Sequence, residues 1–170
     1  WDYQQLTEKV AGVNSIEVGL FASKRVTLDQ LLANISLLKP RLNAIQAAPL
    51  AIYNLISFDQ QVNGLTIIIN SEAENTDLLI VDGISFWLRS IPTSKVDADL
   101  VKEIQRSMEY YKSLMKEATN FQTILLMGNK FKEPDNVKFI TNNFANEIKI
   151  FNTFNKVKLS SNINLAYFNE

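Results

Sequence analysis

The chain has 170 residues, of which 46% are hydrophobic and 21% are charged, and its formal net charge is −1. This length allows one substantial core or two small packed units, and a near-neutral chain has no overall basic field to favour nucleic acid or an anionic membrane, which leaves only local patches. The sequence contains neither cysteine nor histidine, so disulfides, thiolate catalysis, Ser-His-Asp triads and histidine-bound metals are excluded within this chain.

The apolar runs and the first residues predict where the protein is located. No apolar run approaches the roughly 18 to 20 residues of a membrane-spanning helix, and the first residues lack the basic-then-apolar start of a signal peptide. We therefore expect a cytoplasmic protein without a direct membrane span. Because the sequence begins at Trp1 without a methionine or a helix cap, we also expect it to be part of a longer protein.

The first 47 residues predict a small unit of strands around one helix. Alternation of apolar and polar residues predicts a strand over residues 15–22, with residues 2–6 as its partner. Thr27 and Gln30 have the spacing of a capping box, so a helix should begin there and end at Pro40. Residues 41–47 predict another short strand. The helix has one apolar face, formed by Leu28, Leu31, Leu32, Ile35 and Leu38.

The middle of the chain predicts a helix and then a β-meander. Pro49 suits a first helical turn and opens a helix through about Ile56. Hydrophobicity falls over residues 58–63, which marks a modest boundary. Between Gly64 and Pro92, three strand-like runs follow at residues 65–69, 78–81 and 84–91, and Asp82-Gly83 supplies the positive φ angles of a tight hairpin. Trp87 and Arg89 then point to the same face of the last strand.

The last third of the chain alternates helices and strands. Residues 97–117 predict an amphipathic helix, residues 121–127 a buried strand closed by Gly128-Asn129, and Pro134 opens another helix before a short strand at residues 147–151. The tail from Asn152 is rich in Asn, Ser and Lys and should be irregular or an edge. The whole order predicts a mixed-sheet α/β fold. The apolar stripe of the first helix consists of Leu100, Val101, Ile104, Met108, Tyr111 and Met115.

Several short stretches follow one another in the order found in a known family. Residues 2–4 read Asp-Tyr-Gln, residues 89–92 read Arg-Ser-Ile-Pro, and residues 103–111 read EIQRSMEYY, which has the spacing EI-x-RS-x-x-YY. Residues 124–129 form a strand that ends in a glycine turn. In this order the stretches resemble PilM, the actin-like cytoplasmic protein of type IV pilus assembly, which is similar to the cell-division protein FtsA. The resemblance implies an actin-like (ribonuclease H-like) fold, with a small inserted α/β subdomain at residues 1–47 and the second-half domain at residues 48–170.

The nucleotide-binding positions of the family are altered in this chain. They fall on Asn70, Ser71, Glu72, Ala73 and Glu74 in one turn and on Gly128 and Asn129 in another. The family pattern has Asp where this chain has Asn70 and Gly where it has Glu72. Glycine lets the backbone approach a phosphate, an Asp oxygen helps to organise magnesium, and a Glu carboxylate repels a phosphate by about 1 kcal/mol or more. We interpret the first turn as a polar turn retained from an ancestral site and the second as a strand-to-loop turn, with an active phosphate-binding site as the alternative.

Other departures point the same way. After Pro92 the family has a paired-glycine turn and a helical segment near the nucleotide, whereas this chain continues directly to the long helix, and the family's first phosphate loop is not present. Asn129 replaces the second glycine of the adenosine turn. We therefore expect no catalytic residues, no bound metal and no cofactor, with ATP and magnesium as the alternative.

The resemblance implies a non-catalytic PilM-like cytoplasmic scaffold of a type IV pilus or related secretion platform. Its partners would be the cytoplasmic tail of a PilN-like inner-membrane protein and other platform components, which would hold it peripherally at the inner membrane. The family binds that tail between the inserted subdomain and the main domain, here around residues 15–40. The cations are scattered, so nucleic acid is not expected; homo-oligomerisation is left open. The alternatives are an authentic actin-like ATPase whose other motifs lie outside this chain, or the degenerate actin-like domain of a GspL-type type II secretion protein.

Overall fold

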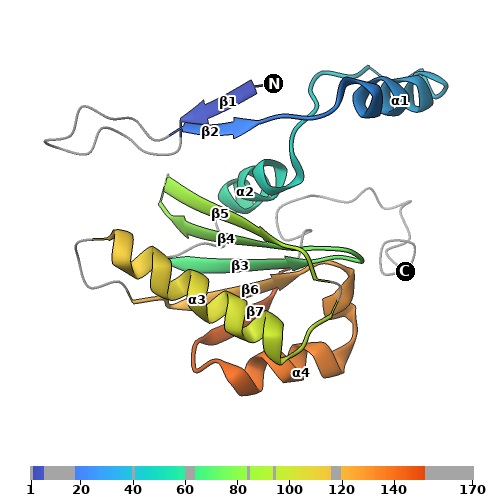
Figure 1. Ribbon diagram of the computed structural model, residues 1–170. Coiled ribbons are helices and arrows are strands. Elements are labelled where there is room, and N and C mark those ends of the chain that lie inside the picture. Colours follow the sequence, from blue (N-terminus) through green and yellow to red (C-terminus); the bar gives the residue numbers. More distant parts are fainter. Residues whose placement is uncertain are drawn as a thin grey trace, which may run out of the picture.

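The computed structural model describes residues 2–5, 18–39, 41–59, 64–83, 85–93, 95–115 and 120–151. These residues form two sheets and four α-helices, and the two-stranded sheet and helix α1 (Arg25–Ser36) stand apart from the larger sheet (Figure 1). Strands β1 (Asp2–Gln5) and β2 (Val18–Phe21) pair antiparallel, with Asp2 opposite Phe21, which confirms that two N-terminal strands pair. Within the described residues, no helix is both long and apolar enough to cross a bilayer.

The larger sheet has five strands in the order β5-β4-β3-β6-β7. Strand β3 pairs antiparallel with β4 and parallel with β6, β4 pairs antiparallel with β5, and β6 pairs parallel with β7. The sheet is therefore mixed, and the predicted α/β fold class is confirmed. The carboxyl ends of β3, β5, β6 and β7 all lie at one edge of the sheet. The strands are β3 (Thr66–Ser71), β4 (Thr76–Asp82), β5 (Ser85–Ile91), β6 (Thr123–Met127) and β7 (Glu147–Ile150).

Helices cover both faces of this sheet. Helices α3 (Ala98–Leu114) and α4 (Pro134–Asn143) pack on one face, and α2 (Ala48–Asp59) packs on the other (Figure 1). Ile67 and Ile69 belong to the core under α3 and α4, whereas Ile68 between them belongs to the core under α2. A strand buried on both faces is apolar without alternation, which is why the run that forms β3 is continuous.

The hairpin between β4 and β5 follows the prediction with one correction. Asp82 is the last residue of β4 and pairs with Ser85, so the turn lies after it. Gly83 has φ +58°, and among the described residues other than glycine only Lys39 has a positive φ. Gly83, and not Asp82, therefore supplies a left-handed conformation of the kind that was expected of this turn.

The sequence of helix α3 explains where the helix begins and which of its residues are buried. The side chain of Asp97 accepts hydrogen bonds from the backbone N–H groups of Asp99 and Leu100, both at 3.1 Å, and so caps the helix. The helix ends at Leu114, earlier than predicted, and Met115 beyond it is 40% exposed. The predicted stripe is otherwise confirmed, with Met108 partly buried and the other members in the core: Leu100, Val101, Ile104 and Tyr111.

Two predictions for the N-terminal part are wrong. Helix α1 begins at Arg25 with Lys24 as a cap that makes no side-chain hydrogen bond, so Thr27 lies inside the helix and forms no capping box. Residues 41–47 form no strand, because no strand of the described chain pairs with them. Helix α1 ends at Ser36, before Pro40, which lies outside the described residues, as do residues 6–17 and the tail from 152.

The later elements confirm their predictions. Helix α2 begins at Ala48, one residue before Pro49, and continues past Ile56 to Asp59. Pro134 occupies the first turn of α4, and Ile140 of that helix is fully buried in the core. Trp87 packs against the same core, and Arg89 reaches α3, so both point to the face that α3 covers. The proposed boundary between residues 47 and 48 stays a prediction.

Candidate functional site

The fold brings the two predicted nucleotide turns together. Strands β3 and β6 are parallel neighbours, and Asn70 near the end of β3 pairs with Met127 at the end of β6. The turn after β3 therefore lies beside Gly128, which begins the short 3₁₀ helix η1 (Asn129–Lys132). Of the seven predicted positions, five meet here: Asn70, Ser71, Glu72, Gly128 and Asn129.

Gly128 is the point of closest approach between the turns. Its φ is +95°, and a Cβ atom built on it would lie 2.8 Å from the backbone N of Ser71, 2.9 Å from Oδ1 of Asn70, and closer still to the carbonyl oxygen of Ser71. Any side chain at this position would collide with the backbone of β3. Glycine is therefore required here by the packing of one turn against the other, whether or not a ligand binds.

Glu72 joins the two turns by hydrogen bonds. Its carboxylate oxygen Oε2 accepts from the side-chain Nδ2 of Asn129 at 3.0 Å and from the backbone N–H of Asn129 at 3.4 Å. We call this contact the Glu72–Asn129 clasp. The Glu72 carboxylate thus accepts from two N–H donors of Asn129. One of them is a backbone N–H group, the kind of donor that a phosphate-binding turn offers to its ligand.

The turn after β3 is also closed by its own bonds. The backbone N–H of Glu72 donates to the carbonyl of Asn75 at 3.0 Å, and the hydroxyls of Ser71 and Thr76, both fully buried, lie 2.9 Å apart. Ala73 and Glu74 lie at the exposed tip of this turn. Asn70 is buried beside Gly128. Within the described residues, no group of three or more acidic side chains could hold a metal ion.

A second polar cluster joins β5 to α3 on the sheet face that α3 and α4 cover. Arg89 donates to Ser107 Oγ at 2.9 Å and also binds the carboxylate of Glu103, which in turn binds Arg106. Hydrogen bonds from Arg106 and, to a smaller extent, from Arg89 hold the pKa of Glu103 below its usual value. The sequence predicted that Arg89 lies on the same face as Trp87, but not that it bonds Glu103 and Ser107. These two residues are the Glu and the Ser of the EI-x-RS spacing, which was the available signal.

The motif at residues 103–111 thereby gains a structural explanation. Tyr110 packs on Trp87 with ring centroids 6.0 Å apart, and Tyr111 packs on Phe121 at the same distance. Ser107 also donates to the carbonyl oxygen of Glu103 at 2.7 Å, which fixes the hydroxyl that Arg89 reaches. Glu103, Ser107 and the two tyrosines of the motif therefore help to dock α3 on the sheet part, whereas Arg106 bonds Glu103 within the helix.

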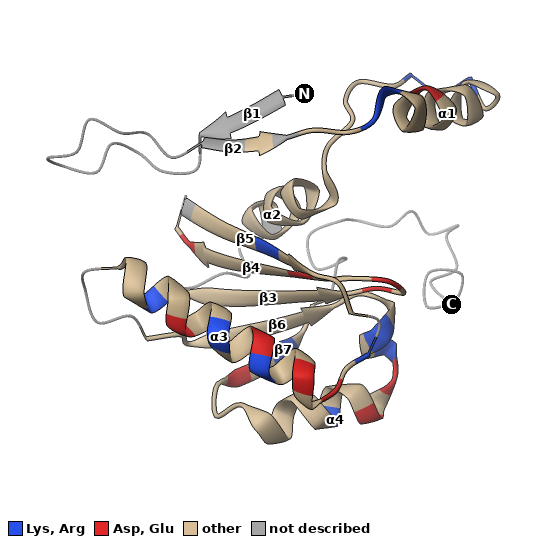
Figure 2. Cartoon of the chain, in the orientation of Figure 1, with Lys and Arg blue, Asp and Glu red and all other residues tan. Residues whose placement is uncertain are grey.

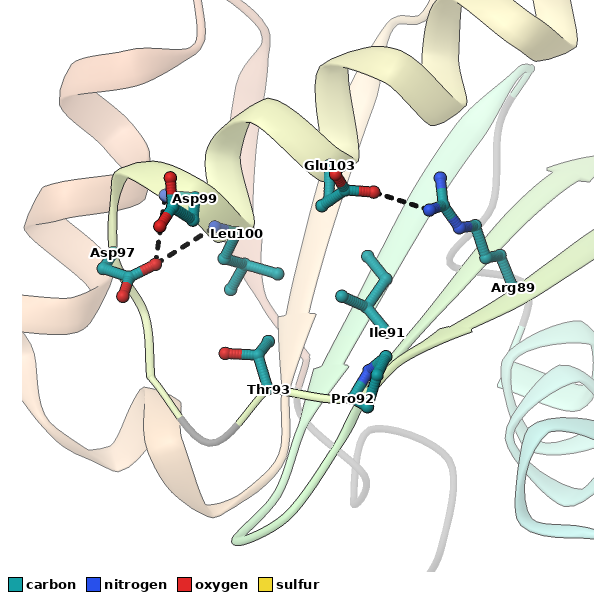
Figure 3. A pocket seen from close by; sticks show the side chains of 8 residues that line it. All are labelled: Arg89, Ile91, Pro92, Thr93, Asp97, Asp99, Leu100 and Glu103. Atoms are coloured by element: carbon teal, nitrogen blue, oxygen red, sulfur yellow. Dashed lines mark hydrogen bonds and ion pairs between the residues drawn. The ribbon is translucent and has the colours of Figure 1, made fainter.

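Two cavities open near the carboxyl edge. The first, of about 360 Å³, lies between the end of β5 and the start of α3 (Figure 3) and is lined by Arg89, Ile91, Pro92, Thr93, Asp97, Asp99, Leu100 and Glu103. Its charged groups already have partners, since Asp97 caps α3, Asp99 pairs with Lys102, and Arg89 pairs with Glu103. The second, of about 350 Å³, lies between the segment before α3 and the start of α4 and is lined by Lys95, Val96, Asp97, Lys130, Glu133 and Asn136.

Comparison with known proteins identifies a fold but no sequence family. No protein-family pattern and no curated protein sequence matches the chain. Among solved structures, the PilM-PilN type IV pilus biogenesis complex matches with a TM-score of 0.70 and 15% identity, over 90% of this chain and 56% of that chain. The chain thus spans little more than half of that structure, and the match shows that it has the PilM-like, actin-like fold.

A second structure is more distant. The ethanolamine utilization protein EutJ from Carboxydothermus hydrogenoformans matches with a TM-score of 0.37 and 12% identity, over 56% of this chain and 46% of that chain. A match at this level carries no weight for the fold or the function.

Proposed function

We propose that this chain is a non-catalytic, PilM-like scaffold of a type IV pilus assembly or related secretion platform. It has no nucleotide cofactor, acts at the cytoplasmic side of the inner membrane, and binds the cytoplasmic tail of a PilN-like inner-membrane protein. The similarity of its fold to a PilM-PilN pilus complex supports the assignment to a pilus machine. The Glu72–Asn129 clasp carries the non-catalytic part of the proposal.

The clasp argues against a bound nucleotide on physical grounds. A phosphate placed at the Asn129 N–H would displace the Glu72 carboxylate or lie within a few ångströms of it. Two such negative charges about 4 Å apart repel by about 1 kcal/mol in water and by about 4 kcal/mol near a protein surface. Asn70 offers no anionic oxygen to organise a magnesium ion that would offset this repulsion. The residues present therefore do not fit a Mg-nucleotide.

The rival function is an authentic ATPase whose remaining motifs lie outside this chain. One observation favours it: the cavity that contains Lys95 and Lys130 opens near the carboxyl edge, where two ammonium groups suit an anionic ligand. Glu133 and Asp97 line the same cavity and oppose that preference.

Because the rival function places its other motifs outside this chain, titration of the full-length protein with labelled ATP and magnesium separates the two functions. The wild-type full-length protein should show no saturable binding at micromolar ATP, and its double variant Asn70→Asp/Glu72→Gly should bind more tightly than the wild type if only this turn has decayed. Glu74→Gly is the matched control, because it removes an acidic side chain from the exposed tip of the same turn. Micromolar binding by the wild type would refute the non-catalytic proposal.

The partner half of the proposal needs its own test. A synthetic peptide with the cytoplasmic N-terminal sequence of the PilN-like protein, immobilised on beads, should retain the wild-type chain, and a scrambled peptide should not. Retention should be insensitive to ATP and magnesium, because a scaffold needs no nucleotide. If the peptide fails to retain the chain, the scaffold function is wrong in this form.

A further inference from the structure

Helix α1 presents an apolar face that no part of the described chain buries. None of its residues is buried, although four apolar side chains recur at helical spacing. Leu31 and Leu32 are 43% and 39% exposed. The apolar surface continues after the helix, where Leu37 and Leu38 are 80% and 81% exposed, and then into the extended segment that precedes α2. We call this surface the α1 apolar face; its members are Leu28, Leu31, Leu32, Ile35, Leu37, Leu38, Leu42 and Ile45.

The charges around this face are almost all positive. Lys24 and Arg25 lie at the start of α1, and Lys39 and Arg41 lie beyond its end. Asp29 is the one acidic residue between residues 22 and 47, and it pairs with Arg25 at 3.7 Å, so the border keeps a net positive charge. Figure 2 shows basic positions at both ends of the helix. The chain as a whole has a net charge of −1, so this cationic border is a local property of the N-terminal part.

The border of cations limits what can cover the face. A second copy of the chain that paired face to face would bring two sets of cations together, which disfavours a symmetric dimer here. A helix of 12 residues is too short to span a bilayer. An apolar strip edged by Lys and Arg suits an anionic lipid surface, where the apolar side chains enter the boundary of the acyl chains and the cations meet the headgroups.

We infer that the α1 apolar face docks on an anionic lipid surface. Lipid is favoured over an acidic protein segment, because the apolar residues continue beyond the helix at Leu37, Leu38, Leu42 and Ile45. A bilayer accepts apolar side chains at irregular spacing, whereas a folded protein partner would need them at fixed positions. In Figure 1, α1 stands apart from the five-stranded sheet, and none of its residues is buried by the described chain. The inference does not depend on nucleotide, but the face overlaps residues 15–40, the region expected to bind the partner tail, so lipid and that tail would compete for it.

Vesicle co-sedimentation of the whole chain tests the inference. The chain should sediment with vesicles of phosphatidylcholine containing 30% phosphatidylglycerol, should stay in solution with pure phosphatidylcholine, and should be released as salt is raised. The variant Leu31→Gln/Leu32→Gln should abolish binding, whereas the control Leu114→Gln changes a leucine of similar exposure, 49%, on α3 and should not. Neutralising Lys24 or Lys39, cations outside the Arg25–Asp29 ion pair, should each weaken binding about fivefold. Neutralising Lys132 and Lys138, exposed cations of η1 and α4, should have no effect.

A fluorescent reporter identifies which side of α1 meets the lipid. The chain has no cysteine, so Leu31→Cys and Ala33→Cys each give a single site for an environment-sensitive dye. The two positions lie about 200° apart around the helix, hence on opposite sides. The dye should shift to the blue at position 31 and not at position 33. Absence of vesicle binding, equal binding to neutral vesicles, or equal shifts at both positions would overturn the inference, and binding of an acidic amphipathic peptide without vesicle binding would assign the face to a protein.

Discussion

Two parts of the molecule differ in how much of their apolar surface is buried: the N-terminal part, residues 2–59, and the sheet part, residues 64–151. Within the described chain, nine of the large exposed hydrophobic residues lie in the N-terminal part and four in the longer sheet part. Among the described residues that form the buried core, only Ile56 comes from the N-terminal part. The sheet part and helix α2, which covers one face of the sheet, therefore bury their apolar surface against each other, whereas the segment before α2 leaves apolar surface for something else to cover.

Core substitutions should show the largest contrast between the two parts. Ile104→Ala in α3 removes a side chain that is fully buried and should lower the free energy of unfolding by about 2–5 kcal/mol. Leu32→Ala in α1 removes a side chain that is 39% exposed and should change it by about 0.5 kcal/mol or less. Urea denaturation of both variants measures the difference. Equal destabilisation would mean that α1 packs against the rest of the chain.

The contact between the two turns should give the next largest effect. Gly128→Ala forces a side chain against Ser71 at a φ of +95° and should destabilise the chain by about 1–3 kcal/mol. Gly83→Ala is the matched control, because Gly83 also has a positive φ but has no atom within 4 Å of its Cβ position. The control should cost about 1 kcal/mol from backbone strain alone. If both variants lose the same stability in urea, the close packing of the turns contributes nothing.

Loss of the clasp should have a smaller effect. Glu72→Ala removes two hydrogen bonds at a partly exposed turn and should reduce stability by less than about 1 kcal/mol. Hydrogen exchange at the backbone N–H of Asn129 should accelerate in this variant and stay unchanged in Glu74→Ala. An Asn129 amide that is equally protected in both variants would argue that the clasp does not form in solution.

The pH dependence should be the smallest effect, and it belongs to the sheet part. Hydrogen bonds from Arg106 and Arg89 lower the pKa of Glu103, and a hydrogen bond from Lys149 does the same for Glu147. A carboxyl whose pKa is lower in the folded state stabilises the fold above its unfolded pKa, so this contribution should be lost as pH falls below about 4.5. Melting temperatures between pH 6 and 3 should fall less in Glu103→Gln/Glu147→Gln than in the wild type.

The sheet part was predictable because its sequence and its environment agree. Continuous apolar runs predicted β3, β4 and β6, since helices cover both faces of the sheet, and Asp97 with a regular stripe predicted α3. In the N-terminal part, periodicity predicted the apolar face of α1 correctly, but periodicity does not say what covers a face. The strand predicted at residues 41–47 failed for the same reason, because a strand also needs a partner.

The resemblance to PilM singled out both turns of the candidate site in the sequence, but it did not predict their contacts. Parallel pairing of β3 with β6 brings the two turns together. Glu72 and Asn129 are separated by 57 residues in the chain, so no local pattern indicates that they bond. The replacement of Gly by Glu72 predicted repulsion of a phosphate, and the structure adds that the same carboxylate has a partner of its own.

Helix α2 determines how a mechanical load would travel through the molecule. Its Ile56 is fully buried against the sheet, and the ring of Tyr53 stacks on Phe86 of β5 with centroids 4.8 Å apart. Residues 41–47, which lie between α1 and α2, form neither helix nor strand and belong to neither sheet. A pull on α1 would therefore tighten this connection first and then act as shear on the Ile56 and Tyr53 contacts, before any strand of the sheet is loaded.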